Sequence, residues 1–154
     1  MAVPPDLEAF AEEVRYYVRD FPELNRLISG EESSSRMVQY CALMALEEWN
    51  ARSPVQFASV SAFPNRLILM TLTVIQLLTS VGILHSRNRL PYNDGGFTAD
   101  TEAQADEYPK WIQMLRAQVN PLIERLIVRL NIAGAYGGGV PSEYSLIHNW
   151  AAWS

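Results

Sequence analysis

The side chains that could carry catalysis or bind a metal ion are few and far apart in this chain. Histidine occurs only at His85 and His148, and cysteine only at Cys41. A metal site needs several such ligands at workable spacing, and a catalytic nucleophile needs a base beside it. We interpret Cys41 as a small core residue and His85 as a residue near a helix end. We therefore predict no catalytic, metal-binding or cofactor-binding residue and no enzyme, and we keep an enzyme that uses a histidine as a third hypothesis.

The charged clusters have simple structural interpretations. Adjacent acids occur at Glu12-Glu13, Glu31-Glu32, Glu47-Glu48 and Asp106-Glu107. Such pairs are typical of solvated helix faces or of negative first turns. Arg66, Arg87 and Arg89 come nearest to a basic cluster, and we expect them to form ion pairs with acidic neighbours rather than a phosphate site. The glycine run lacks the Lys-Ser/Thr ending of a phosphate-binding loop.

Length and composition indicate one folded domain. The chain has 154 residues, 49% hydrophobic and 19% charged, which excludes a disordered chain and makes two full-sized domains unexpected. The net charge of −5 argues against a nucleic-acid-binding module with a broad basic face. The single cysteine excludes an intramolecular disulfide, and the first residues do not resemble a secretory signal. We expect a soluble, mildly acidic protein from a compartment that is reducing or indifferent to redox.

Apolar residues at three- and four-residue spacing predict helices in the first third of the chain. The first helix ends near Asp20. Its apolar face consists of Leu7, Phe10, Val14, Tyr17 and Val18. Asp20 and Glu23 have capping-box spacing for a short second helix that ends at Gly30. One of the serines at 33–35 caps a third helix. The apolar face of that helix consists of Met37, Tyr40, Cys41 and Met44, and extends to Trp49.

A run without any charge, residues 67–84, predicts a central helix. It is almost as long as the roughly twenty apolar residues of a membrane span, but polar residues and a glycine interrupt it and no second span accompanies it. We favour a helix that is surrounded by other helices. Because the chain has few elements with which to surround it, we expect self-association to supply the missing contacts.

A further long helix is expected from about Thr101, where a capping box begins. Its apolar face consists of Tyr108, Trp111, Ile112, Leu115 and Val119. Pro121 lies inside this pattern, so we expect a kink or break just before it. From residue 126 the apolar residues alternate, which predicts a short strand near 126–133, with helix continuation to Leu130 as the alternative. The predicted fold is mainly α: a bundle of about four to five helices with a long Gly-rich loop, this strand and an extended C-terminal arm.

The end of the chain has the composition of a docking arm. Residues 134–139 contain four glycines, and each glycine costs a helix about 1 kcal/mol relative to alanine. Large apolar residues nevertheless follow, namely Tyr144, Leu146, Ile147, Trp150 and Trp153. Mobility beside aromatic anchors suits a segment that docks on another surface. We therefore divide the chain into a helical bundle domain, 1–133, and an extended Gly/aromatic docking arm, 134–154.

Three stretches carry a family resemblance. They are residues 21–36 (FPELNRLISGEESSSR), 80–96 (SVGILHSRNRLPYNDGG) and 135–144 (AYGGGVPSEY). Together they resemble the head-to-tail connector proteins of tailed bacteriophages, the small neck or adaptor subunits. The resemblance implies a virion protein, made in the host cytoplasm, that consists of a helical bundle with long loops and a terminal arm. It also implies assembly as a ring, commonly of twelve copies, beneath the portal.

The resemblance implies a structural subunit that joins the portal to the tail and lets DNA pass without sequence-specific binding. Its expected partners are further copies of itself, the portal protein and other neck and tail proteins, with no membrane. The loop after the central helix would contact a ring neighbour or the portal through Arg87, Asn88, Arg89, Tyr92, Asp94, Gly95 and Gly96. The arm would dock through Tyr136, Tyr144, Trp150 and Trp153, with Gly137, Gly138 and Gly139 supplying the bend.

Two alternatives to a ring-forming adaptor follow from the same residues. Several phage proteins of this size share the features that the resemblance implies, so a head-closure or tail-end protein is the first alternative. The second is a small helical regulatory or interaction protein that forms a homodimer through the central helix. A high-order ring in solution supports the phage neck, whereas a dimer supports the regulatory protein.

Overall fold

The computed structural model describes residues 5–20, 33–87 and 101–137. Within these ranges the chain forms four helices: α1 (Pro5–Val18), α2 (Ser35–Arg52), α3 (Arg66–Arg87) and α4 (Thr101–Gly137). The described residues contain no strand, so the prediction of a mainly helical fold is confirmed. The predicted short helix at 20–30 and the Gly-rich loop lie outside the described residues.

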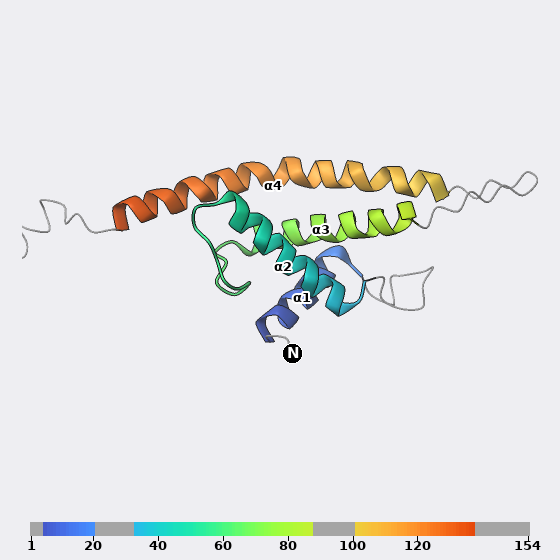
Figure 1. Cartoon of the computed structure of the whole chain (residues 1–154), viewed down its shortest axis with the longest axis horizontal. Helices are drawn as coiled ribbons and strands as arrows, with labels where there is room; N and C mark the ends of the chain where they lie inside the picture. Colours follow the sequence, from blue (N-terminus) through green and yellow to red (C-terminus); the bar gives the residue numbers. More distant parts are fainter. Residues whose placement is uncertain (1–4, 21–32, 88–100, 138–154) are drawn as a thin grey trace, which may run out of the picture.

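The other three helices pack around α3, which contacts each of them (Figure 1). α2 packs against α1 and α3, whereas α4 packs against α3 on the side away from α1. α3 and α4 run antiparallel, and the C-terminal end of α4 extends past the other helices (Figure 1). The central position predicted for the uncharged helix is therefore confirmed.

The end of α1 is fixed to the start of α2 by buried polar contacts. Arg19, just past the helix, has a φ of 58°, a left-handed conformation that ends α1. Asp20 follows, and its carboxylate accepts a hydrogen bond from the Ser33 backbone N–H at 2.9 Å. The buried Arg15 guanidinium donates to the Ser33 carbonyl at 2.6 Å. These three residues, Arg15, Asp20 and Ser33, form a polar clamp that joins the two ends of segment 21–32.

The apolar face of α2 differs from the predicted one. Ser34 is the N-cap, as one of the predicted alternatives, and its hydroxyl accepts from the Met37 N–H at 3.3 Å. The buried residues are Val38, Cys41, Ala42, Ala45, Leu46 and Trp49. Only Cys41 and Trp49 belong to the predicted face. The other three predicted members, Met37, Tyr40 and Met44, are exposed, because the contact face of α2 is turned toward its small residues Ala42 and Ala45.

The loop after α2 is held against the core by Trp49 and Asn50. The Trp49 indole N–H donates to the Val55 carbonyl at 3.1 Å, and the Phe63 ring packs edge-on against the indole at 4.9 Å between centroids. The Asn50 amide accepts from the Phe57 N–H at 2.9 Å and donates to the Phe57 carbonyl at 3.0 Å. These contacts, with the buried Val60 and Phe63, hold the segment between α2 and α3 against the core.

α3 begins at Arg66, two residues after Pro64, with the Asn65 side chain accepting from the Ile68 N–H at 3.2 Å. Its buried residues are Ile68, Leu69, Thr71, Leu72, Thr73, Val74, Ile75 and Leu77. Its threonine hydroxyls donate to carbonyls one turn earlier, which allows polar side chains in an apolar helix. By length and composition the part Arg66–Leu84 also qualifies as a membrane span, a test that the core helix of a soluble protein passes equally. In its last turns Leu84 is 55% exposed.

α4 is continuous through Pro109 and Pro121, so of the kink or break predicted just before Pro121 the break is wrong. The strand predicted near 126–133 is also wrong, because these residues are helical. Leu126 is buried against the core and Leu130 is packed against it, which satisfies a helical spacing of four residues. The alternation that suggested a strand arises because Val128 and Ile132, on the opposite face, are apolar and exposed. The helix alternative weighed for this segment is the observed one.

The helix continues to Gly137, four residues past the predicted end of the bundle domain. The glycine-rich segment was expected to exclude a helix, but Gly134 and Gly137 both belong to α4. Their cost of about 1 kcal/mol each applies to a last turn that follows a long, well-packed helix. Residues 138–154 of the predicted docking arm lie outside the described residues.

Candidate functional site

The structure separates the two segments predicted to contact partners. Arg87 is the last residue of α3, whereas Tyr136 and Gly137 end α4. Because the two helices are antiparallel, these positions lie at opposite ends of the pair (Figure 1). At 1.5 Å per residue, α4 spans about 55 Å. The remaining predicted interface residues lie outside the described residues: Asn88, Arg89, Tyr92, Asp94, Gly95, Gly96, Gly138, Gly139, Tyr144, Trp150 and Trp153.

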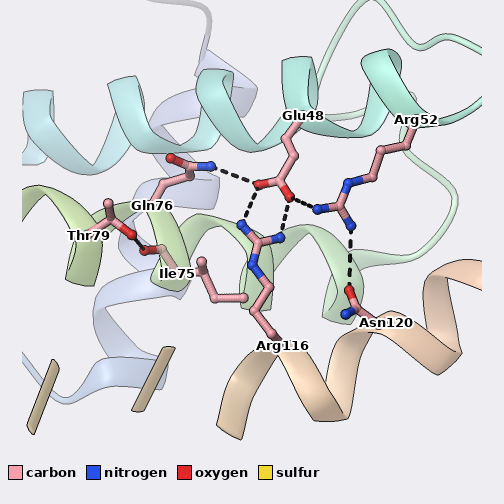
Figure 2. A network of polar contacts seen from close by, with 7 residues as sticks. All are labelled: Glu48, Arg52, Ile75, Gln76, Thr79, Arg116 and Asn120. Carbon is pink, nitrogen blue, oxygen red and sulfur yellow. Dashed lines mark hydrogen bonds and ion pairs between the residues drawn. The ribbon is translucent and has the colours of Figure 1, made fainter. Parts of the chain in front are cut away.

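A polar network centred on Glu48 joins three helices (Figure 2). The Glu48 carboxylate on α2 accepts two hydrogen bonds from the Arg116 guanidinium on α4, one of them at 3.1 Å. It also accepts from the Gln76 amide on α3 at 2.8 Å and pairs with Arg52 at 2.6 Å. Arg52 in turn donates to the Asn120 side chain on α4 at 3.4 Å. The network therefore connects α2 to α4, which share no backbone packing.

The network holds Glu48 ionised. Burial alone would raise the pKa of this carboxyl. The hydrogen bonds and charge of Arg116, the charge of Arg52 and the hydrogen bond from Gln76 outweigh burial and lower the pKa below its usual value of 4.5. A carboxylate with a lowered pKa and its oxygens already bound is a poor general acid or base near neutral pH. We interpret the network as a structural junction.

The stability of the protein should fall in acid through Glu48. A group whose pKa is lowered by folding adds stability above its usual pKa, and this stability is lost as the pH falls through the folded value. We expect Glu48→Gln to reduce the free energy of unfolding at about pH 7, and the difference from the wild type to shrink as the pH falls below 4.5. Urea unfolding at a series of pH values measures this difference. A difference that stays constant with pH would contradict a lowered pKa for Glu48.

Two other residues that could take part in chemistry, Cys41 and Arg66, also make structural contacts. Burial raises the pKa of the Cys41 thiol, which keeps it protonated in the core, as predicted. Arg66 forms a bidentate ion pair with Glu13, at 2.5 and 2.7 Å, which confirms the expected acidic neighbour. Among the described residues, no group of three or more His, Cys, Asp or Glu side chains could hold a metal ion. The side chain of His85 and all of His148 lie outside the described part of the chain.

The exposed apolar side chains are the remaining candidates for function. They occur on all four helices: Tyr16, Tyr17, Met37, Tyr40, Leu43, Met44, Leu67, Ile83, Leu84, Trp111, Met114, Val128 and Ile132. Single exposed apolar residues are normal, but contiguous ones mark contact surfaces. On α4 the exposed apolar residues Val128 and Ile132 lie one helical turn apart, on the same face of the helix.

Scans of known protein families, curated proteins and solved structures found no match to this chain.

Sequence reasoning missed the Glu48 network. The Glu47-Glu48 pair was interpreted as a solvated face, which fits Glu47 but not the half-buried Glu48. A signal for the difference was present, since Glu48 lies seven residues after Cys41 and three after Ala45, both on the buried face. The partners Gln76 and Arg116 could not have been found in this way, because only the packing of three helices brings them together.

Proposed function

We propose that this chain is a structural, non-enzymatic virion protein of a tailed bacteriophage, one subunit of a neck ring that joins the portal to the tail and lets DNA pass. The support for self-association is apolar surface that the described residues of one copy leave exposed. Helix α3, which carries no charge from Leu67 to Leu84, contacts each of the other described helices and yet exposes more than half of Leu67 and Leu84. Burying such side chains in contacts between copies is favourable by about 25 cal/mol per Å² of apolar area.

The assignment to a phage neck rests on the sequence resemblance. All three resembling stretches include a helix end: 21–36 ends in the first turn of α2, 80–96 begins in the last turns of α3, and 135–144 begins in the last turn of α4. Since the last two of these ends are separated by the length of α4, one subunit can contact different partners at its two ends. Such separation suits a component that connects two larger structures.

The mass and shape of the full chain in solution test this proposal. We expect native mass spectrometry and negative-stain electron microscopy of the purified protein to show closed rings of many copies with a central opening. The expected mass is a multiple of 17.4 kDa. A particle that stops at a twofold dimer supports the homodimeric regulatory protein instead. A dimer, or a monomer at every attainable concentration, would overturn the proposed ring.

A further inference from the structure

The C-terminal part of α4 carries a basic, apolar surface. Arg125, Val128, Arg129 and Ile132 follow one another at helical spacing on the face of α4 that does not contact α3, and all four are exposed. We call these four residues the α4 end surface. Val128 is 56% exposed and Ile132 is 54% exposed. Glu124, the acid nearest in sequence, is exposed one turn before Val128 and borders this surface.

The exposed face of α1 carries the opposite charge at the same spacing. Glu8, Glu12 and Tyr16 lie in one line along this helix, four residues apart, and are exposed. We call these three residues the α1 outer surface. The neighbouring Glu13 is already paired with Arg66. Arg15, the basic residue nearest to this line in sequence, is buried and donates to the Ser33 carbonyl.

The charges on both surfaces are available for a partner. Glu8, Glu12, Arg125 and Arg129 form no ion pair within the described residues, whereas Arg52, Arg66, Lys110 and Arg116 each do. A spacing of four residues places each pair of like charges about 6 Å apart along its helix. Two helices laid side by side in parallel then bring Glu8 opposite Arg125 and Glu12 opposite Arg129.

The two surfaces cannot meet within one copy. α1 and α4 share no contact, and α3 lies between them (Figure 1). A contact between them therefore joins two copies and uses a different surface on each. Such a heterologous contact adds one copy after another in the same direction, and it closes into a ring when the rotation between copies divides a full turn.

We propose that the α4 end surface of one copy docks on the α1 outer surface of the next copy. This proposal rests on the self-association in the proposed function and names the residues that produce it. The charges determine which surfaces meet. The acidic α1 outer surface attracts the basic α4 end surface of another copy, whereas each surface repels the same surface of another copy.

Charge reversal tests the contact. We expect the full chain with Glu8→Arg and Glu12→Arg, and separately the chain with Arg125→Glu and Arg129→Glu, to associate about tenfold or more weakly than the wild type in sedimentation velocity. Mixing the two variants should restore association, because the arginines of one α1 then meet the glutamates of the other α4. Unchanged association of either variant, or a mixture that stays dissociated, would overturn the proposed contact.

Two controls separate this contact from general effects of charge. The chain with all four reversals keeps the original net charge of −5 and should assemble like the wild type. Glu47→Arg reverses an exposed charge on α2, outside both surfaces, and should leave association unchanged. Because all five positions are exposed, circular dichroism and urea unfolding should show an intact fold in every variant. A Glu47→Arg variant that dissociates as much as the others would overturn the assignment to these surfaces.

Disulfide trapping distinguishes a failure of this contact from a failure of the proposed function. In a chain with Glu12→Cys and Arg129→Cys, oxidation should yield a ladder of covalent oligomers that ends at the copy number of the ring. The native Cys41 is buried and should not contribute. Rings without a ladder overturn this contact and leave the proposed ring standing. A ladder on open filaments confirms the contact and overturns the ring, and a monomer without a ladder overturns both.

Discussion

Replacing Trp49 by alanine is expected to lower the free energy of unfolding by about 3–5 kcal/mol. Trp49 is fully buried, and its ring packs against two phenylalanines in the loop after α2, perpendicular to Phe63 at 4.9 Å and tilted against Phe57 at 6.4 Å between centroids. Its indole N–H also donates a hydrogen bond to the Val55 carbonyl. The substitution therefore creates a cavity in the core and removes the residue that holds the loop against it.

Urea unfolding followed by circular dichroism measures this loss. Trp49→Phe should cost less, because an aromatic ring remains and the main loss is one hydrogen bond, worth about 1 kcal/mol. Trp111→Ala is the matched control, since Trp111 is 53% exposed and its removal should change stability by no more than about 0.5 kcal/mol. Equal losses for Trp49→Ala and Trp111→Ala would show that the loop is not anchored as described.

Replacing Glu48 by alanine is expected to cost about 1–3 kcal/mol, the second large effect. The substitution leaves Arg116 and Arg52 close together without the carboxylate between them, and it removes the acceptor of the Gln76 amide. Removing one partner of a half-buried ion pair costs more than the pair contributes net, because the remaining charges stay partly desolvated. The loss should therefore exceed that of an ordinary surface ion pair.

The neighbouring acid provides the control for this prediction. Glu47→Ala removes the same side chain from the adjacent, exposed position and should change stability by less than about 0.5 kcal/mol. In a double-mutant cycle with Arg116→Met, the coupling to Glu48 should be about 0.5–3 kcal/mol. Additive losses in this cycle, or equal losses for the two glutamates, would show that the network does not link α2 to α4.

The helices of this protein could be predicted from sequence, but not all of their orientations. The Ser34 cap, the start of α3 after Pro64 and the start of α4 at Thr101 follow from local signals that depend on a few neighbouring residues. The face that α2 turns inward does not. Met37 and Tyr40 are more hydrophobic than Ala42, yet the close approach of α3 favours the small residue at the contact.

Packing against residues distant in sequence also determines that α4 is helical through Pro121 and residues 126–133. Alternation near 126–133 and the proline at 121 both argued locally against a helix. The burial of Val119 and Ile123 around Pro121 stabilises the helical form over this region. The same contrast between local and long-range information applies to the residues of the proposed contact. Their types were visible in the sequence, but the placement of Glu8 and Arg125 on separate sides of α3 became apparent only from the fold.

The polar clamp of Arg15, Asp20 and Ser33 has a consequence for the length of the connection between α1 and α2. Because the clamp fixes both ends of segment 21–32 by buried hydrogen bonds, the helices do not depend on the length of chain between them. Doubling that length would cost only about 0.6 kcal/mol of loop-closure entropy. By this estimate the entropy of closure sets only a weak limit on the number of residues between Asp20 and Ser33. The hydrogen bonds of the clamp, rather than the length of the connection, then hold the end of α1 beside the start of α2.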